Sequence, residues 1–207
     1  MKLIQRQGYL DFLRRNRNRP IVKVVSGIRR CGKSTLFRLF KGELLSEGVK
    51  PEQIISINFE ELEYEHLRDY HALYQYILER MQPDEMNYIF LDEIQHVDQF
   101  HRVVDSLFVK ENTDLYITGS NAYFMSSDIA TLLTGRYVEI QMLPLSFSEF
   151  YYSKYDGNQY SLIPAYESYL RESSFPYTQQ LGGEAFDIQE NLRGLYKTLL
   201  LHDDVAR

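Results

Sequence analysis

The stretch that decides the fold is GIRRCGKS, residues Gly27 to Ser34. It matches the pattern G-x-x-x-x-G-K-[ST], a loop whose backbone N–H groups surround phosphate oxygens. The residues before it, IVKVVS (21–26), are rich in β-branched side chains and predict a buried strand, and residues 34–47 predict a helix. The pattern requires this strand–loop–helix context, because the positive end of the helix dipole then faces the phosphate.

Each part of this loop has an expected role. Lys33 should reach the β- and γ-phosphates, and the hydroxyl of Ser34 should bind Mg²⁺. Arg29 and Arg30 either add positive field beside the nucleotide or face solvent or pair with acids. Cys31 is expected to be a small filler whose oxidation would obstruct the site. The residues predicted to bind the nucleotide are Gly27, Ile28, Arg29, Arg30, Cys31, Gly32, Lys33, Ser34 and Thr35.

A second motif, YIFLDE (88–93), is an apolar strand that ends in two acids. It begins after enough chain for one helix, one strand and another helix beyond the phosphate loop. In that context Asp92 would hold Mg²⁺ in the Walker B position. Glu93 would then polarise the attacking water as a general base. The alternative is an acid pair that only caps the next helix.

The rest of the chain alternates between strand and helix patterns. Further strands are predicted at 53–59, 88–92, 114–120 and 136–143, and further helices at 66–81 and 99–109, after a leading helix that ends near residues 16–20. This alternation predicts an α/β fold with a five-stranded parallel sheet, covered on both faces, to about residue 145. Helical patterns alone follow, in SFSEFYYSKY and near 161–173 and 187–203.

Two more positions carry candidate catalytic residues. The strand at 114–120 closes with a polar stretch, so Ser120 or Asn121 would lie beside the γ-phosphate if this strand lies between the first and the third. An ordinary turn is the alternative. Arg136, just before the fifth strand, is placed to act as an arginine finger on a neighbouring subunit's nucleotide. A plain salt bridge is nearly as well supported.

Composition excludes several classes of protein. The 207 residues have a net charge of −6 and one cysteine, so there is no disulfide framework and no cysteine-based zinc site. No apolar run approaches the roughly 20 residues of a membrane helix. The start, MKLIQRQGYLDF, lacks the pattern of a secretory signal. We therefore expect a cytoplasmic protein with no membrane partner.

Charge is distributed unevenly along the chain. Residues 1–41 carry twelve Lys and Arg against one Asp, a formal +11, whereas the remainder carries eleven bases and 28 acids, a formal −17. The basic start either marks an anion-binding or DNA-binding end or is a helix with a solvated basic face. The overall pI of about 5.4 disfavours a dedicated nucleic-acid protein.

Four stretches together resemble a family of prokaryotic AAA+-type P-loop ATPases. They are GIRRCGKST, FLDEIQHV, LYITGSNA and LLTGRYVEIQMLPLSFSEF, in this order. Members of that family carry G-x-R-R-x-G-K-[ST], D-E-I-Q after the Walker B strand, T-G-S after the fourth strand and a G-R…L-P-L-S-F-x-E-F block. The block is the part most specific to the family, because it has no general P-loop role.

The resemblance implies an AAA+ (ASCE-type) core over 1–145 and a small helical lid over 146–207. It assigns Lys33, Ser34, Asp92 and Glu93 as above, Ser120 or Asn121 as the sensor, and Arg136 as the candidate finger. Members of the family continue into a C-terminal domain with a nuclease-like fold. This sequence ends in a stretch similar to the one that leads into that domain, so we expect a truncated form, the product of a degenerate gene or a stand-alone ATPase core.

The expected function is Mg²⁺-dependent hydrolysis of the β–γ bond of ATP, with ATP and Mg²⁺ as cofactors and a homo-oligomer as the assembly that a trans finger needs. One alternative is a nucleotide-dependent switch or scaffold with little hydrolysis of its own. Another is an ATP-dependent, DNA-associated protein. A GTPase is disfavoured because no N-K-x-D motif is present. A small-molecule kinase is disfavoured because an acid directly after Asp92 suits water activation better.

Overall fold

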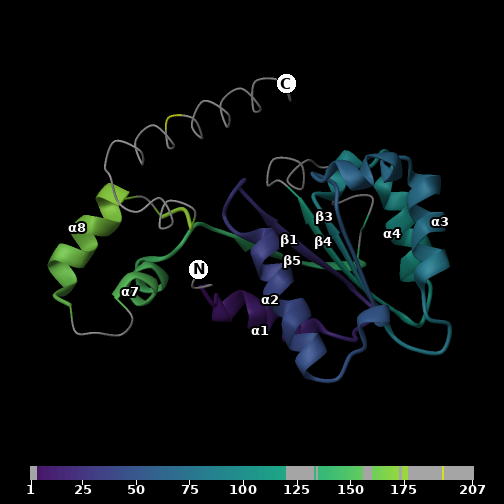
Figure 1. Cartoon of the computed structure of the whole chain (residues 1–207), viewed down its shortest axis with the longest axis horizontal. Helices are drawn as coiled ribbons and strands as arrows, with labels where there is room; N and C mark the ends of the chain where they lie inside the picture. Colours follow the sequence, from purple (N-terminus) through teal and green to yellow (C-terminus); the bar gives the residue numbers. More distant parts are fainter. Residues whose placement is uncertain are drawn as a thin grey trace. The chain divides into compact units, whose positions relative to one another are not determined.

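The structure is a computed structural model that describes residues 4–119, 133, 135–155, 160–172, 174–176 and 193 (Figure 1). The predicted sensor residues, Ser120 and Asn121, lie outside these described residues, as does most of the predicted helix at 187–203. The chain divides into two compact units, of which one contains residues 7–28 and 33–142. The other contains residues 29–32 together with the described residues before 7 and after 142.

The first unit, called here the sheet unit, is built on five strands. Its helices and strands are α1 (Gln7–Asn16), β1 (Val22–Gly27), α2 (Lys33–Ser46), β2 (Ile54–Asn58), α3 (Tyr70–Arg80), β3 (Asn87–Asp92), α4 (Phe100–Phe108), β4 (Thr113–Gly119) and β5 (Tyr137–Met142). Short 3-10 turns lie at Pro51–Gln53, Leu62–Leu67 and Ile94–His96.

All five strands are parallel, in the order β2-β3-β4-β1-β5. The predicted five-stranded parallel α/β fold is therefore confirmed. β4 lies between β1 and β3, which is the condition stated for the sensor position. Because parallel strands end at the same edge of a sheet, the loop after Gly27 and the acids at Asp92 and Glu93 follow carboxyl ends at one edge, with the end of β4 between them.

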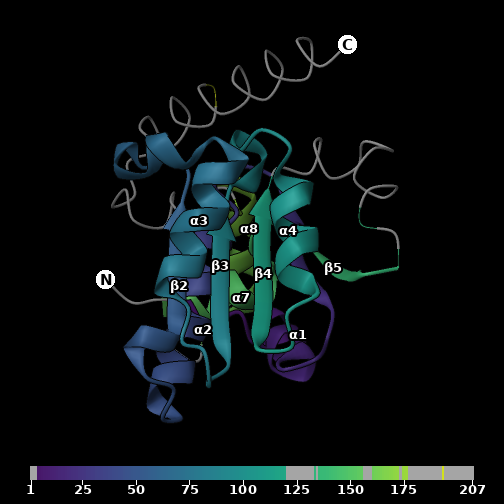
Figure 2. The ribbon, with the colours of Figure 1, turned by 90° about the vertical axis from the view of Figure 1, so that its right-hand side faces the viewer.

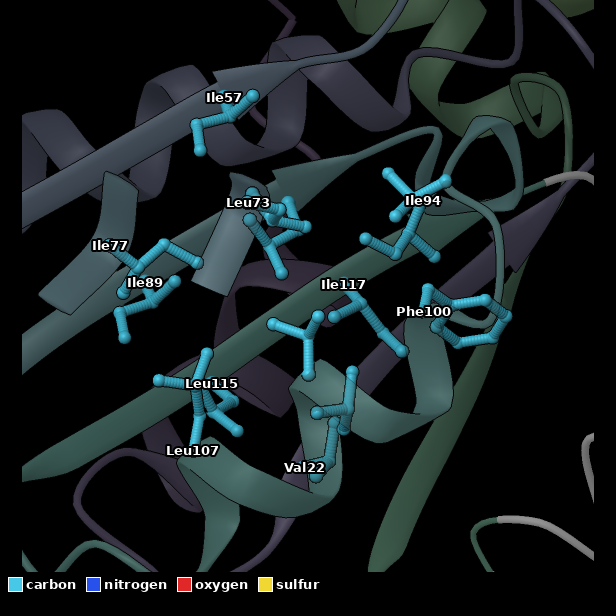
Figure 3. Packing of buried hydrophobic residues seen from close by; sticks show 14 of the residues in the cluster. Val22, Ile57, Leu73, Ile77, Ile89, Ile94, Phe100, Leu107, Leu115 and Ile117 are labelled. Atoms are coloured by element: carbon cyan, nitrogen blue, oxygen red, sulfur yellow. The ribbon is translucent and has the colours of Figure 1, made fainter. Parts of the chain in front are cut away.

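Helices cover both faces of this sheet (Figures 1 and 2). In Figure 2, α3 and α4 lie in front of β3 and β4, whereas α2 lies behind. On the α3–α4 face, a cluster of apolar residues is almost completely buried, and Figure 3 shows Leu73, Ile89 and Ile117 among the side chains of this cluster. On the α2 face, Phe37 and Phe40 pack edge-on or tilted against Phe90 and Tyr116. Burial on both faces explains why β1, β3 and β4 are buried along their length.

The third helix begins later than its periodicity predicts. The apolar pattern predicts a helix from residue 66, but α3 begins at Tyr70 and residues 62–67 form a 3-10 turn. The side chain of Asp69 accepts a hydrogen bond from the N–H of Ala72, which caps the helix at that point. A cap fixes a helix start more strongly than the continuation of an apolar stripe.

The second unit is called here the tail unit. It contains α7 (Phe147–Tyr155) and α8 (Leu162–Glu172), which agree with the helical patterns of the sequence. Ser146 and Glu149 form a capping box at the start of α7: the N–H of Ser146 donates to Oε2 of Glu149, and the N–H of Glu149 donates to Oγ of Ser146. Phe150 is fully buried. The predicted lid boundary at 146 stays a prediction.

None of the described helices is long and apolar enough to cross a membrane.

Candidate nucleotide site

The first group of candidate residues lies in the sheet unit at the carboxyl ends of β1 and β3. Lys33 begins α2, and its side chain turns back to the end of β1. Its Nζ donates to the carbonyl of Gly27 at 3.1 Å and forms an ion pair with Oε1 of Glu93 at 3.0 Å. Both side chains of this pair are at least 94% buried. An unpaired charge would be costly at such a depth, so each charge depends on the other.

Glu93 has a backbone conformation that is rare for a residue with a side chain. Its φ and ψ of 56° and 50° lie in the left-handed region. Its N–H donates to Oγ1 of Thr118 at 2.9 Å, and its Oε2 accepts from Nε2 of Gln95 at 2.6 Å. Conformations of this kind cost about 1–3 kcal/mol and cluster at functional sites. In this conformation the carboxylate of Glu93 forms its ion pair with Lys33.

Asp92 precedes Glu93, and its carboxylate accepts a hydrogen bond from the hydroxyl of Thr118. Burial raises the pKa of Asp92 above its usual value, although the hydroxyl groups of Ser34 and Thr118 act in the opposite direction. The Ser34 hydroxyl, in the first turn of α2, is thus close to the Asp92 carboxylate at the end of β3.

These two groups fit a Mg²⁺ ion. Mg²⁺ prefers hard oxygen ligands, and it is commonly bound through one or two protein groups while water and phosphate oxygens complete its octahedron. Asp92 and Ser34 supply one carboxylate and one hydroxyl. No group of three or more His, Cys, Asp and Glu side chains that could hold a metal is found among the described residues.

The middle of the phosphate loop, residues 29–32, belongs to the tail unit. Arg29 is half-buried, whereas Arg30 is exposed and has a φ of 65°. Cys31 is fully buried. Gly32 has a φ of 107°, a value that side chains rarely permit. Beside them in the chain, Ile28 and Thr35 are half-buried.

Arg136 lies at the end of the sheet opposite the candidate site, where the strands begin. Because Tyr137 pairs with Val22 at the start of β1, Arg136 is next to the amino ends of the strands, away from Lys33. Its Nη1 forms an ion pair with Oδ1 of Asp105 at 2.7 Å, and about half of its side chain is exposed. The salt bridge that the sequence left as the alternative is therefore present. Within one subunit, Arg136 is not brought to the candidate site.

Two residues of the site were missed by sequence reasoning, Thr118 and Gln95. Thr118 lies in the stretch LYITGSNA, from which only Ser120 and Asn121 were expected to contribute to the site. In the structure its hydroxyl links Asp92 to the backbone of Glu93. The strand order would have found it, since Leu91 pairs with Ile117 and the next residues of both strands become neighbours. Gln95 carried no signal beyond its place in D-E-I-Q.

Comparison with known proteins places this geometry in a family. A family model described as an AAA domain matches residues 19–151. An uncharacterized protein of Haemophilus influenzae is 38% identical over 207 residues, which are 99% of this chain and 51% of that protein. An uncharacterized protein of Methanocaldococcus jannaschii is 31% identical over 134 residues, 62% of this chain and 28% of that protein. The chain thus spans about half, or less, of the length of these relatives.

Solved structures agree on the fold. A Walker-type ATPase of Pyrococcus abyssi superposes with a TM-score of 0.59 at 17% identity, over 97% of this chain and 74% of that one. AMPPCP-bound DnaA of Aquifex aeolicus superposes with a TM-score of 0.57 at 12% identity, over 95% and 62%. At such identities the likeness concerns the fold alone. On the family match, which covers the phosphate loop and all five strands, this chain belongs to the AAA domain family.

Proposed function

We propose that this chain binds ATP with Mg²⁺ and hydrolyses its β–γ bond. The observation that carries the proposal is the grouping of Lys33, Ser34, Asp92 and Glu93 where β1 and β3 end. A cation, a carboxylate–hydroxyl pair and a second carboxylate are the groups that phosphoryl transfer to water needs. The AAA domain match supports ATP as the nucleotide.

In this proposal, the backbone N–H groups of residues 27–34 and the positive end of α2 bind the phosphates. Lys33 binds β- and γ-phosphate oxygens and stabilises the charge that develops on them. Ser34 and Asp92 hold Mg²⁺, which when bound neutralises phosphate charge. Glu93 orients a water molecule and takes its proton.

The Lys33–Glu93 ion pair gives this reaction an order. A γ-phosphate would compete with Glu93 for the same Nζ, since both are anions that need the cation of Lys33. Once Lys33 is bound to phosphate, Oε1 of Glu93 is released to accept from water, while Gln95 still holds Oε2. Nucleotide binding would thereby activate the base.

A switch with little hydrolysis is the second candidate, and it is favoured by the same contacts. Glu93 is already bonded through both carboxylate oxygens, and Arg136 is absent from the site of its own subunit. If a neighbour must supply the finger, an isolated subunit would be slower by about 10³–10⁵-fold. Homo-oligomerisation is therefore part of the proposal.

A DNA-binding role gains less support. Two arginines of the basic start pair with acids: Arg14 bonds Glu43, and Arg17 bonds Glu47. The fully buried Lys23 bonds Asp114. These contacts favour the interpretation of the segment as a solvated helix with partnered charges.

The testing experiment measures phosphate release from ATP and Mg²⁺ over a range of protein concentrations, beside ATP binding. Wild type is compared with Glu93→Gln, and Glu79→Gln on the exposed surface of α3 serves as the matched control. We expect wild type and the control to hydrolyse ATP, and Glu93→Gln to bind it without turnover. A specific rate that rises with protein concentration supports a trans finger. Binding without turnover in all three proteins favours the switch, and no binding in any refutes both.

A further inference from the structure

Among the described residues, Arg6 makes five hydrogen bonds, to the phosphate loop, to the segment after β5 and to Glu149 of α7. It precedes α1, belongs to the tail unit and is only 5% exposed. Its Nη1 donates to the carbonyl of Cys31 at 3.2 Å and to the carbonyl of Leu143 at 2.6 Å. Its Nη2 donates to the carbonyl of Pro144 at 3.1 Å. Its Nε and Nη2 also bind the two carboxylate oxygens of Glu149, at 2.9 and 3.0 Å.

The guanidinium is fixed from the other side as well. Oε2 of Glu149, one of its acceptors, also accepts from the N–H of Ser146 in the capping box of α7. The hydrogen bonds from Arg6 and Ser146 outweigh the effect of burial, which alone would raise the pKa of Glu149, and hold it below its usual value. A planar fork bound to a carboxylate of fixed position has little freedom to turn. Arg6 is therefore a rigid donor toward Cys31.

The contact with Cys31 bears on the phosphate loop directly. In a trans peptide the C=O and the following N–H point in opposite directions across the peptide plane. When Arg6 holds the carbonyl of Cys31, it turns the N–H of Gly32 away from itself. Gly32 has no side chain, and its φ of 107° is a value that glycine adopts without strain. The hydrogen bond from Arg6 is therefore a restraint on the orientation of this peptide.

We propose that Arg6 is a positioning residue for the nucleotide: it presets the Cys31–Gly32 peptide so that the N–H of Gly32 donates to a phosphate oxygen. This rests on the proposed function, because it presupposes that residues 27–34 bind phosphate. Glu149 supports the effect by holding Arg6. The same guanidinium also joins the loop to the Leu143–Pro144 carbonyls before α7, so the two segments share one anchor.

The hydrogen bond from Arg6 to Cys31 and the binding of phosphate are thermodynamically linked. If the Arg6 bond to Cys31 favours the loop conformation that binds phosphate, phosphate must in turn favour that bond by the same factor. ATP should therefore slow hydrogen exchange at residues 28–32 and also in the first turn of α7, whose cap contains Glu149. A purely structural anchor predicts no nucleotide effect at α7.

The test compares Arg6→Gln, Arg6→Lys and Glu149→Gln with the control Lys154→Gln. The control breaks an ion pair to Glu172 in the same unit, between α7 and α8, and touches no part of the loop. Loss of one hydrogen bond from a charged group corresponds to about ten- to a hundredfold in a binding constant. We expect Arg6→Gln to weaken ATP and ADP binding by at least about tenfold. Arg6→Lys and Glu149→Gln should lie between Arg6→Gln and wild type.

The split between binding and turnover separates positioning from stability. At saturating ATP, the turnover of Arg6→Gln should stay much closer to wild type than its Kd does, and Lys154→Gln should lower the Tm without changing the Kd. The double variant Arg6→Gln/Glu149→Gln should bind no worse than Arg6→Gln alone, because Glu149 acts through Arg6. If Arg6→Gln does not fold, the nucleotide affinity of Glu149→Gln and the hydrogen exchange of wild type test the positioning role.

Failure of the Arg6 positioning role and failure of the proposed function give different results. Unchanged ATP and ADP affinity in Arg6→Gln, or in Glu149→Gln where Arg6→Gln does not fold, overturns the proposal while leaving the proposed function intact. Unaltered exchange at α7 in wild type with ATP overturns it too. If wild type binds neither ATP nor ADP, the proposed function fails and the positioning role fails with it.

Discussion

Nζ of Lys33 and Oε1 of Glu93 lie 3.0 Å apart in a part of the sheet unit where both side chains are almost completely buried. Lys33 is the proposed phosphate ligand, and Glu93 is the proposed base. Their pairing means that each neutralises the other until an anion competes for Lys33. The first prediction follows from that competition.

We predict that Glu93→Gln binds ATP more tightly than wild type does. Glutamine keeps the shape of the side chain but removes its charge. ATP then no longer has to displace an anionic partner from Lys33. Close charge pairs of this kind are worth more than exposed ones, whose coupling is about 0–1 kcal/mol. Isothermal titration of ATP into both proteins measures the change, with Glu79→Gln as the control. Weaker binding by Glu93→Gln would contradict the competition.

Thr118 gives a second prediction, because its hydroxyl both donates to Asp92 and accepts from the N–H of Glu93. Thr118→Val keeps the shape and removes both bonds, leaving a buried N–H without its partner. We expect the free energy of unfolding to fall by about 1–3 kcal/mol and turnover to fall more than ATP affinity. Thr118→Ser, which retains the hydroxyl, should behave like wild type in urea unfolding and in phosphate release.

Should Thr118→Ser lose as much stability as Thr118→Val, the methyl group and not the hydroxyl would be responsible. That result would remove Thr118 from the site.

Arg30 combines a positive φ with an exposed side chain, and two variants separate these properties. Both Arg30→Gly and Arg30→Ala remove the guanidinium, but only glycine adopts a φ of 65° without strain. We expect Arg30→Gly to be more stable than Arg30→Ala by about 1 kcal/mol in thermal unfolding. Equal stability would mean that the loop relaxes when the side chain is shortened.

The ATP affinities of the same two variants test the charge. An exposed charge is screened by solvent, so its loss should weaken binding by no more than about fivefold, equally in both. A much larger and equal loss would assign Arg30 a direct contact with phosphate.

Glu149 predicts how stability depends on pH. Its pKa is lowered in the folded state from a reference of 4.5. A carboxyl with a lowered folded pKa contributes stability that is fully present above the unfolded pKa and is lost as pH falls through the folded one. The stability difference between wild type and Glu149→Gln should thus be constant above about pH 5 and shrink below about pH 4.5. Urea unfolding between pH 6 and pH 3.5 measures it.

Glu167→Gln, which removes an exposed carboxylate of α8, serves as the matched control. It should show little difference from wild type at any of these pH values. A Glu149→Gln difference that grows on acidification would reverse the sign and contradict the assigned contact with Arg6.

Much of the fold was predictable because it depends on patterns that repeat. Buried strands read as apolar, β-branched runs, and every predicted strand agrees with the structure to within a residue or so at each end. The phosphate loop and the acids after β3 were predictable as well, because their types and spacing are fixed by what phosphate and Mg²⁺ need. The structure brings Lys33, Ser34, Asp92 and Glu93 together, although their roles remain proposals.

The contacts that sequence reasoning missed join polar residues far apart in the chain. Arg6 meets Glu149 across 143 positions, and Lys23 meets Asp114 across 91. Glu149 lies in the L-P-L-S-F-x-E-F block, but nothing in that block indicates Arg6 as its partner. Lys23 lies within a run that reads as an apolar strand. Asp114 also accepts a hydrogen bond from the hydroxyl of the buried Tyr116. Partners of this kind become visible only when strand order and loop paths are known.

The final prediction concerns Arg136 and its ion-pair partner Asp105. Within one subunit, Arg136 lies at the amino ends of the strands and bonds Asp105 at 2.7 Å. As a finger it would act on a neighbour's nucleotide, where its loss costs about 10³–10⁵-fold in turnover. As a plain surface salt bridge it is worth about 0–1 kcal/mol of stability and nothing in turnover.

Arg136→Ala and Asp105→Asn distinguish these roles, because both break the ion pair but only the first removes the guanidinium. We expect the two variants to lose the same small amount of stability. We expect only Arg136→Ala to lose ATP turnover at protein concentrations where the wild-type specific rate has reached its plateau. Mixing Arg136→Ala with Glu93→Gln, each inactive alone, should restore part of the activity, since each supplies the group that the other lacks. Equal turnover in Arg136→Ala and Asp105→Asn would mean that Arg136 is not a finger and forms only the surface salt bridge.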